Sequence, residues 1–181
     1  MSEIETERLL MRKYTPDDAD AHLRIVSEPE FQRFMPPSYQ PTRDRVLVAI
    51  GRFTEHWYQL GYGVWALESK GETGLIGYCG LRRILPTDEI ELLYGIAREH
   101  WGRGLVTEAA HAALRYGFEQ MNFARVMAVT VHENMRSRRV MEKCGLRYEK
   151  DARYFDVDCV YYALNREDFR QDNDALYLLR P

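Results

Sequence analysis

The sequence predicts an α/β protein in which a mixed sheet of seven strands is flanked by about four helices, in the order β-α-α-β-β-β-α-β-α-β-β. Between residues 62 and 97, three strand-like segments follow one another with short turns, which is typical of an antiparallel meander. Residues 125–131 form a nearly continuous apolar run of the kind buried on both faces of a sheet. The 181 residues contain no repeat and no linker, so we expect one domain, 1–181, with its core in 6–169 and a tail at 170–181.

The first part of the chain contributes one strand and two helices. Residues 7–14 are strand-like, and Thr15 with the following Pro-Asp-Asp is a helix start. This helix is expected to reach about residue 27, where Glu28-Pro29 stops it, and residues 31–41 form an apolar loop. Thr42 caps a second helix that Gly61 ends, with a core stripe made of Val46, Ile50, Phe53, Trp57 and Leu60.

The remaining elements alternate between strands and helices. A short helix is capped by Asn134 and closed by Gly145. A longer helix follows the loop at 99–104 and ends near residue 121. We expect strands at 62–68, 75–84, 89–97 and 125–131, and a final hairpin of 146–154 and 159–164 whose turn is 156–158.

Composition excludes several classes of protein. The net charge is −3 and the basic residues are scattered, whereas a dedicated nucleic-acid binder carries a basic patch. The N-terminus lacks the basic and apolar segments of a signal peptide, and no apolar run reaches membrane-spanning length. The three cysteines are widely spaced and the five histidines show no paired spacing, so we expect reduced thiols, a cytoplasmic location and no metal site.

Residues 99–108, Glu-His-Trp-Gly-Arg-Gly-Leu-Val-Thr-Glu, join a predicted strand to a predicted helix. Two glycines let the backbone approach a ligand, and the unpaired N–H groups of a helix start favour phosphate. Taken alone, the loop is more simply an ordinary turn. A dinucleotide-binding loop would need a third small residue where Thr107 stands, a P-loop would need a following Lys-Ser/Thr pair, and no G-x-S-x-G elbow is present.

Three segments, in order along the chain, favour a phosphate-binding role for this loop over an ordinary turn. Residues 99–104 resemble the Q/R-x-x-G-x-G/A pyrophosphate loop of the GNAT superfamily of acyl-CoA-dependent N-acyltransferases, with Glu99 departing from the usual Gln or Arg. Residues 101–109 resemble the W-G-x-G-x-x-T-E-A version found in the branch that acetylates ribosomal-protein N-termini. Residues 6–12 and 134–146 are similar to that branch's opening strand and its N-x-x-S…K-x-G-F/L segment. The resemblance covers residues 6–169 and implies the GNAT fold with a mostly antiparallel sheet.

The resemblance also implies where acetyl-CoA binds. Amides of residues 102–107 would hold the pyrophosphate with help from the helix dipole. Main-chain groups of residues 95–97 would pair with the pantetheine arm, which would lie in a gap beside the parallel strand 125–131. Asn134 would contact the arm from the other side, a role compatible with capping its helix. Four arginines, Arg103, Arg136, Arg138 and Arg139, could meet CoA phosphates, although a solvated surface charge is the better expectation for each. The implied cofactor residues are Gly95, Ile96, Ala97, Gly102, Arg103, Gly104, Leu105, Val106, Thr107 and Asn134.

Acyl transfer to an amine requires a proton acceptor and stabilisation of the departing thiolate. Glu91 lies at the family's acidic position and is the predicted base or amine-orienting group, with Glu89 on the same strand face as second choice. Alternatively, Glu89 and Glu91 are simply two exposed carboxylates on a strand, without a catalytic role. Many members carry a Tyr seven residues after the Asn, where this chain has Met141. Ser137 is the predicted substitute for this tyrosine in stabilising the thiolate. Alternatively, Ser137 is only a small residue packed in the first helical turn. Positioning of the amine against the thioester can by itself supply much of the acceleration of acyl transfer.

We therefore expect an N-acetyltransferase that transfers an acetyl group from acetyl-CoA directly to a primary amine, with a protein or peptide N-terminus as the branch-level acceptor. The alternatives are a small-molecule N-acetyltransferase acting on an amino acid, polyamine or antibiotic, and a non-catalytic acyl-CoA-binding regulatory module, which Met141 favours. The apolar tail segment 175–179 predicts docking on a partner subunit, as in a homodimer, or on its own domain. The aromatic residues that could line the acceptor site are Phe31, Phe34, Tyr39, Trp57, Tyr154 and Tyr161, although Trp57 fits the core stripe better.

Overall fold

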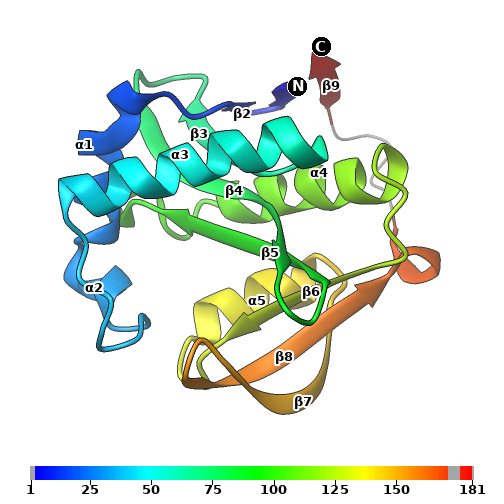
Figure 1. The fold of residues 1–181 in the computed structure, drawn as a ribbon. Coiled ribbons are helices and arrows are strands. Elements are labelled where there is room, and N and C mark those ends of the chain that lie inside the picture. Colours follow the sequence, from blue (N-terminus) through cyan, green and yellow to red (C-terminus); the bar gives the residue numbers. More distant parts are fainter. Residues whose placement is uncertain (1–2, 171–175, 181) are drawn as a thin grey trace.

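The computed structural model describes residues 3–170 and 176–180, which form one sheet with helices on both faces (Figure 1). The helices are α1 (Ala19–Val26), α2 (Pro29–Gln32), α3 (Arg43–Leu60), α4 (Leu105–Glu119) and α5 (Met135–Lys143). The strands are β1 (Glu3–Thr6), β2 (Leu9–Arg12), β3 (Val64–Ser69), β4 (Leu75–Ile84), β5 (Glu89–Ile96), β6 (Arg125–Thr130), β7 (Arg147–Tyr154), β8 (Val157–Asn165) and β9 (Tyr177–Arg180). The nine strands lie in the order β7-β8-β6-β5-β4-β3-β2-β1-β9. All neighbours are antiparallel except β5 and β6, so the predicted mixed α/β sheet is confirmed.

The sheet has nine strands rather than the predicted seven, for two reasons. The expected opening strand at 7–14 is replaced by the hairpin of β1 and β2, because the Thr6 hydroxyl accepts the Leu9 N–H at 3.1 Å and closes a turn between them. The second extra strand is β9, which pairs with β1 over Thr6 to Glu3. Of the two docking modes predicted for the tail, residues 177–180 adopt the one on their own chain, while Ala175 lies outside the described residues.

Two local predictions are wrong. Pro29 begins the one-turn helix α2 instead of only stopping the helix before it, because proline suits the first helical position, and the described residues therefore contain five α-helices. The final hairpin turns at Phe155 and Asp156, whose φ angles are 53° and 62°, as a tight two-residue turn requires. Val157 and Asp158, expected in the turn, belong to β8.

The predicted helix ends are confirmed. The Thr42 hydroxyl accepts the Arg45 N–H at 3.3 Å and starts α3, and Gly61 ends it with a left-handed φ of 74°. Asn134 caps α5 through its side-chain oxygen. At Thr15 the capping box is present, although the first turn there, Pro16–Asp18, is a 3-10 helix that precedes α1.

The two faces of β5 serve different cores. Leu92 and Ile96 pack with the buried side of α4, whereas Leu93 packs in a second cluster with residues of α1 and α3. β5 pairs with β4 along its whole length but with β6 only at Glu91 and Met127. Beyond that pair the two parallel strands separate toward the end of the molecule where α2 and the start of α5 lie (Figure 1). This separation positions the site described below.

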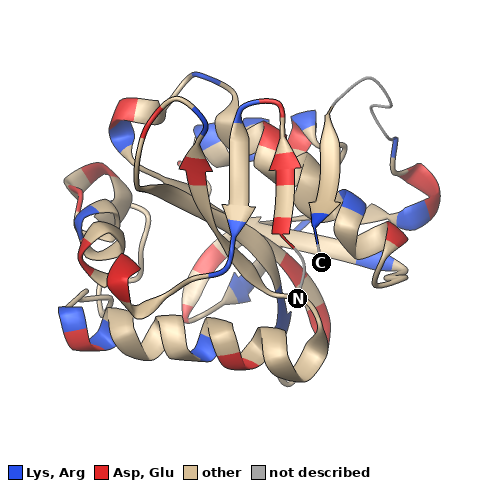
Figure 2. Ribbon diagram, turned by 90° about the horizontal axis from the view of Figure 1, so that it is seen from above, with Lys and Arg blue, Asp and Glu red and all other residues tan. Residues whose placement is uncertain are grey.

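No helix in the described part of the chain is long and apolar enough to cross a membrane. Figure 2 shows acidic and basic residues interspersed along the same helices and strands.

Candidate active site

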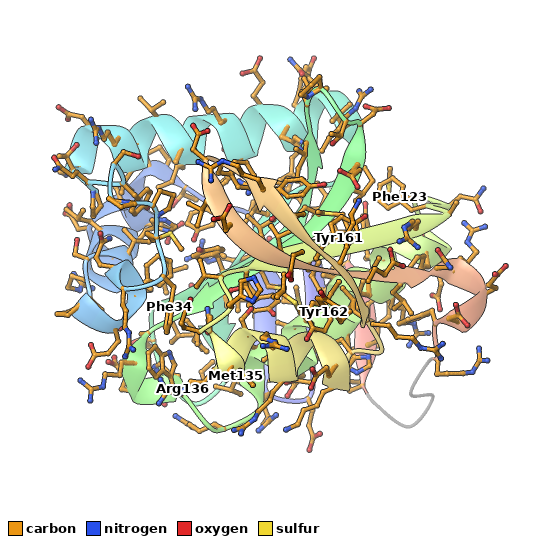
Figure 3. The ribbon with its side chains drawn as sticks, turned by 90° about the horizontal axis from the view of Figure 1, so that it is seen from below. Phe34, Phe123, Met135, Arg136, Tyr161 and Tyr162 are labelled. Carbon is orange, nitrogen blue, oxygen red and sulfur yellow. The ribbon has the colours of Figure 1, made fainter. Side chains whose placement is uncertain are left out.

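A cleft of about 390 Å³ opens at the end of β5. Its walls come from the segment 30–35 around the end of α2, the end of β5, the loop and first turn of α4, and α5 from its cap Asn134 to its last residue, Lys143. Figure 3 shows Phe34 and Arg136, which come from two of these walls, at the same end of the molecule. All predicted cofactor residues except Ala97 and Arg103 line the cleft, and so does Ser137.

The start of α4 presents unpaired amide groups to this cleft. Gly102 and Gly104 have φ angles of 75° and 77°, a left-handed conformation that favours glycine. The first intrahelical bond runs from the Glu108 N–H to the Gly104 carbonyl at 3.0 Å. The N–H groups of Leu105, Val106 and Thr107 therefore precede the helical ladder and, with the positive end of the helix dipole, form a ready anion site.

The side chain of Glu108 holds this helix start against the β1–β2 hairpin. Its carboxylate accepts the Thr6 hydroxyl at 2.6 Å, the Arg8 N–H at 2.9 Å and the Arg8 Nε–H at 2.6 Å. Arg8 in turn donates to the Arg103 carbonyl at 2.8 Å. The two sequence segments that resemble the ribosomal-protein branch, 6–12 and 101–109, are thus in direct contact.

The free edge of β5 differs in register from the prediction. The Ala97 N–H donates to the Ile76 carbonyl at 2.9 Å, and the Ala97 carbonyl accepts the His100 N–H at 3.0 Å, so both its main-chain groups are engaged within the protein. In an antiparallel ladder, alternate residues point their main-chain groups to opposite edges. Gly95 therefore faces β4 as Ala97 does, and Tyr94 and Ile96 direct their groups toward the side where β6 has separated. The Ile96 carbonyl already accepts the Trp101 Nε1–H at 3.0 Å.

Basic residues of α5 form one wall of the cleft. Arg136, Arg139 and Lys143 line it, and the Arg136 guanidinium lies 4.5 Å from the centre of the Trp101 ring. Two predicted arginines point elsewhere. Arg103, which does not line the cleft, donates toward His100 Nδ1 at 3.1 Å, and Arg138 donates to the Tyr162 hydroxyl at 3.1 Å. Helical spacing within α5 could have identified Lys143, which follows Arg136 and Arg139 at intervals of three and four residues.

Asn134, Ser137 and Tyr94 meet at the inner part of the cleft. The Asn134 side-chain oxygen accepts the Ser137 N–H at 3.2 Å, so its capping role is confirmed. The Tyr94 hydroxyl lies 3.0 Å from both the carbonyl and the Oγ of Ser137. Met141, at the position where many family members carry a tyrosine, is only 1% exposed and belongs to the core. Tyr94 was missed from the sequence, although strand alternation places it on the face opposite Glu91.

Glu91 and Glu89 lie on the other face of β5, outside the cleft lining, and have unlike surroundings. Glu91 is 4% exposed and is paired with the Arg82 guanidinium. Burial raises its pKa and Arg82 only partly offsets this. Glu89 accepts hydrogen bonds from the Tyr154 hydroxyl at 2.6 Å and the Tyr161 hydroxyl at 2.8 Å. Burial acts to raise the pKa of Glu89, but these bonds outweigh it and leave that pKa below its ordinary value.

The predicted acceptor aromatics fall into three groups. Phe31 and Phe34 line the cleft together with Met35, whereas Trp57 is a core residue that is 2% exposed. Tyr39 is exposed and lies outside the cleft lining. Tyr154 and Tyr161 bind Glu89, as described above. Within the described residues, no group of three or more His, Cys, Asp or Glu side chains is arranged to hold a metal ion.

Comparison with known proteins places the chain in a family. The family described as acetyltransferase (GNAT) domain matches residues 8–147, and the chain belongs to this family of acyl-CoA-dependent N-acyltransferases. An uncharacterised protein of Bacillus subtilis, YkkB, is 38% identical over 89% of this chain and 94% of its own. YoaA, named as an uncharacterised N-acetyltransferase of the same species, is 29% identical over 84% of this chain and 86% of its own.

Solved structures agree with this assignment. A GNAT-family acetyltransferase from Bacillus anthracis superposes with a TM-score of 0.76 at 27% identity, over 91% of this chain and 99% of that one. The ribosomal-protein-S5-alanine acetyltransferase of Vibrio fischeri shares the fold, with a TM-score of 0.75 at 19% identity over 93% of this chain and 99% of that one. The expected GNAT fold and enzyme class are confirmed.

Proposed function

We propose that the protein transfers an acetyl group from acetyl-CoA to a primary amine, using the cleft at the end of β5. The observation that carries this proposal is the start of α4, where three residues with unpaired N–H groups line the cleft. They suit the pyrophosphate, and the basic wall of Arg136, Arg139 and Lys143 suits the remaining phosphate. The cleft residues therefore fit CoA, which supplies the acetyl thioester when bound.

The main-chain partners of the pantetheine arm are proposed to be Tyr94 and Ile96, in place of Gly95 and Ala97. This follows from strand alternation and from the bonds that already engage Ala97. Asn134 borders the same space from α5, and because its oxygen is used in capping, its side-chain NH₂ is the group available to a ligand. Arg103 is proposed to contribute its backbone only.

Glu91 is the proposed proton acceptor, directly or through water. Its raised pKa brings it closer to the working pH than Glu89, and the bonds from two tyrosines hold Glu89 in its ionised, hydrogen-bonded form. Glu91 takes the proton from the amine, the amine nitrogen bonds to the acetyl carbon, and the carbon–sulfur bond breaks with its electron pair on sulfur. Because β5 and β6 pair only at Glu91 and Met127, the amine can approach from the Glu91 face while the thioester lies on the other.

The acceptor is proposed to be a protein or peptide N-terminus, and a protein acceptor is supported by the name of the Vibrio fischeri structure, a ribosomal-protein-S5-alanine acetyltransferase. A small-molecule amine is the second candidate, because the wall of Phe31, Phe34 and Met35 is apolar and the one acid beside it, Glu30, is already paired with Arg98. Release of free thiol with a panel of amines and peptides separates these two. Tight CoA binding without turnover on any acceptor would instead support a non-catalytic module.

The pyrophosphate assignment predicts opposite behaviour of two substitutions at Gly104. Aspartate and asparagine both tolerate a left-handed φ and have the same shape, so Gly104→Asp and Gly104→Asn should fold alike. Only the aspartate places a carboxylate at the expected phosphate position. We expect CoA affinity, measured by calorimetry, to be at least about tenfold weaker in Gly104→Asp than in Gly104→Asn. Equal affinities in the two variants would contradict the assignment.

A further inference from the structure

Two hydroxyl groups from opposite walls of the cleft are in contact. Tyr94 comes from β5 and Ser137 from the first turn of α5, and both line the cleft. Their oxygens are 3.0 Å apart, and the Tyr94 hydroxyl is also 3.0 Å from the Ser137 carbonyl. The main chain of Ser137 is held by the Asn134 cap, so the serine cannot easily move away from this contact.

The direction of these hydrogen bonds is constrained by chemistry. A carbonyl oxygen only accepts, so a Tyr94 proton given to the Ser137 carbonyl leaves the Tyr94 oxygen to accept the Ser137 hydroxyl. If Tyr94 instead donates to Ser137 Oγ, the Ser137 O–H is free to point into the cleft and donate to a ligand. Both arrangements need only a rotation of the two hydroxyls, since both acceptors are at the same distance. Burial raises the pKa of Tyr94, with a smaller opposing effect of its bond to Ser137, so the tyrosine stays protonated and serves as a donor.

The order of groups along the cleft indicates what lies at this point. Besides Tyr94 and Ser137, Thr107 is the hydroxyl-bearing residue of the lining, and it belongs to the helix start at the pyrophosphate end. A ligand arm running along β5 away from that end passes Ile96 and reaches Tyr94 two residues, or about 7 Å, further on. On the opposite wall it passes Asn134 and reaches Ser137 after about one helical turn. The two hydroxyls therefore border the end of the CoA arm that carries the sulfur.

The sequence already predicts that Ser137 stabilises the CoA thiolate, and we propose that Tyr94 is the positioning residue that orients the Ser137 hydroxyl toward that sulfur. The proposal rests on the CoA assignment above. The Ser137 hydroxyl donates to the sulfur as negative charge develops there, and Tyr94 donates to Ser137 Oγ. No proton is transferred in this step, and the electron pair of the broken carbon–sulfur bond remains on sulfur.

The test uses CoA and desulfo-CoA, so it does not require a known acceptor. Thiolate absorbance of protein-bound CoA is followed as a function of pH, and affinities for CoA and desulfo-CoA are measured by calorimetry at pH 7 and pH 9.5. In the wild-type protein we expect the bound thiol to ionise about one pH unit below free CoA, and the preference for CoA over desulfo-CoA to rise with pH by about tenfold. Ser137→Ala should abolish both effects, Tyr94→Phe should remove most of each, and Ser137→Thr, which keeps the hydroxyl, should retain them.

Tyr116→Phe is the matched control. It deletes a buried tyrosine hydroxyl that donates to the Gly61 carbonyl at 2.7 Å, remote from the cleft lining, and should leave the thiol titration unchanged. Tight CoA binding with the same titration in Tyr94→Phe and the wild type would overturn the proposal while leaving the CoA site intact. If the wild-type protein bound neither compound, the proposed function would fail, and this proposal with it.

Discussion

Glu89 and Glu91 are two residues apart on one face of β5, yet their environments separate their chemistry. Tyr154 and Tyr161 stabilise the charged form of Glu89, whereas burial penalises the charged form of Glu91 more than Arg82 compensates. A base that works near neutral pH benefits from the second environment. Neighbours that lie up to about seventy residues away in the chain, such as Tyr161, produce this difference.

Glu91→Gln tests this assignment through activity and stability together. The turnover of any accepted amine should fall by about 10²-fold or more, because the proton acceptor is lost. In the wild-type protein, activity should decline as pH falls through the raised pKa of Glu91. This limb of the pH profile should be absent from the residual activity of the variant, as steady-state assays across pH would show.

The stability of Glu91→Gln should change in the opposite direction. A carboxyl whose pKa is higher in the folded than in the unfolded protein binds its proton more tightly when folded, so stability falls as pH rises from the unfolded value to the folded one. At pH 7 the neutral glutamine avoids this cost, and Tm should be equal to or above that of the wild type. Below about pH 4 the difference should vanish. A variant that is less stable at pH 7 would show that the Arg82 ion pair outweighs the burial.

At the scale of elements, the cleft depends on how the start of α4 is held. A helix start with two left-handed glycines is not rigid by itself, and here Glu108 joins it to the β1–β2 hairpin through Thr6 and Arg8. The Glu108 side chain is 17% exposed, so these bonds are partly shielded from water and charge-assisted. The hairpin thereby acts as a support for the anion site, although it contributes no residue to the cleft lining.

Glu108→Ala should therefore weaken both the fold and the ligand site. Loss of a carboxylate with three hydrogen-bond donors should lower the free energy of unfolding by about 1–3 kcal/mol in urea titrations. CoA affinity should fall as well, because the amides of residues 105–107 lose their fixed orientation. The control is Glu119→Ala at the other end of α4, which removes an i,i+4 pair with Arg115 and should leave CoA affinity unchanged. Equal CoA affinity in both variants would show that the hairpin does not support the site.

At the scale of the whole molecule, the tail completes the sheet. β9 pairs with β1 at one edge, Arg180 forms an ion pair with Glu5, and the Arg115 guanidinium lies 4.3 Å over the Tyr177 ring. The strand protects the outer edge of β1 from other chains, since an unpaired edge is a template for further pairing. The tail thus packs against the β1–β2 hairpin, which in turn holds the start of α4.

A chain that ends at Arg170 should consequently be less stable and should self-associate. Chemical denaturation should show a lower midpoint, and light scattering after size-exclusion chromatography should show species larger than the full chain forms. Arg180→Gln is the control, because it removes only an exposed ion pair and should cost no more than about 1 kcal/mol. A truncated chain with unchanged stability and size would mean that β9 contributes nothing to the sheet in solution.

Much of the fold and part of the site could be predicted because local chemistry encodes them. Thr42, Gly61 and Asn134 mark helix ends by bonds to residues within a few positions, and strand alternation correctly put Glu89 and Glu91 on one face of the strand. Local chemistry does not encode the contacts of groups whose partners are distant or depend on register. Ala97 is engaged by Ile76 across the ladder, and the side chain of Arg103 bonds to His100 without itself lining the cleft.

The fold class, the family and the glycine loop that opens α4 can all be recognised in the sequence, because each depends on residue types at short, ordered spacings. The hydroxyl that contacts Ser137, in contrast, is apparent from the three-dimensional packing alone. Met141 stands where many family members have a tyrosine, and its side chain is buried in the core. The hydroxyl that contacts Ser137 belongs instead to Tyr94 in β5, 43 residues earlier in the chain. That contact depends on how closely β5 and α5 approach each other across the sheet, and no spacing within one segment records that distance.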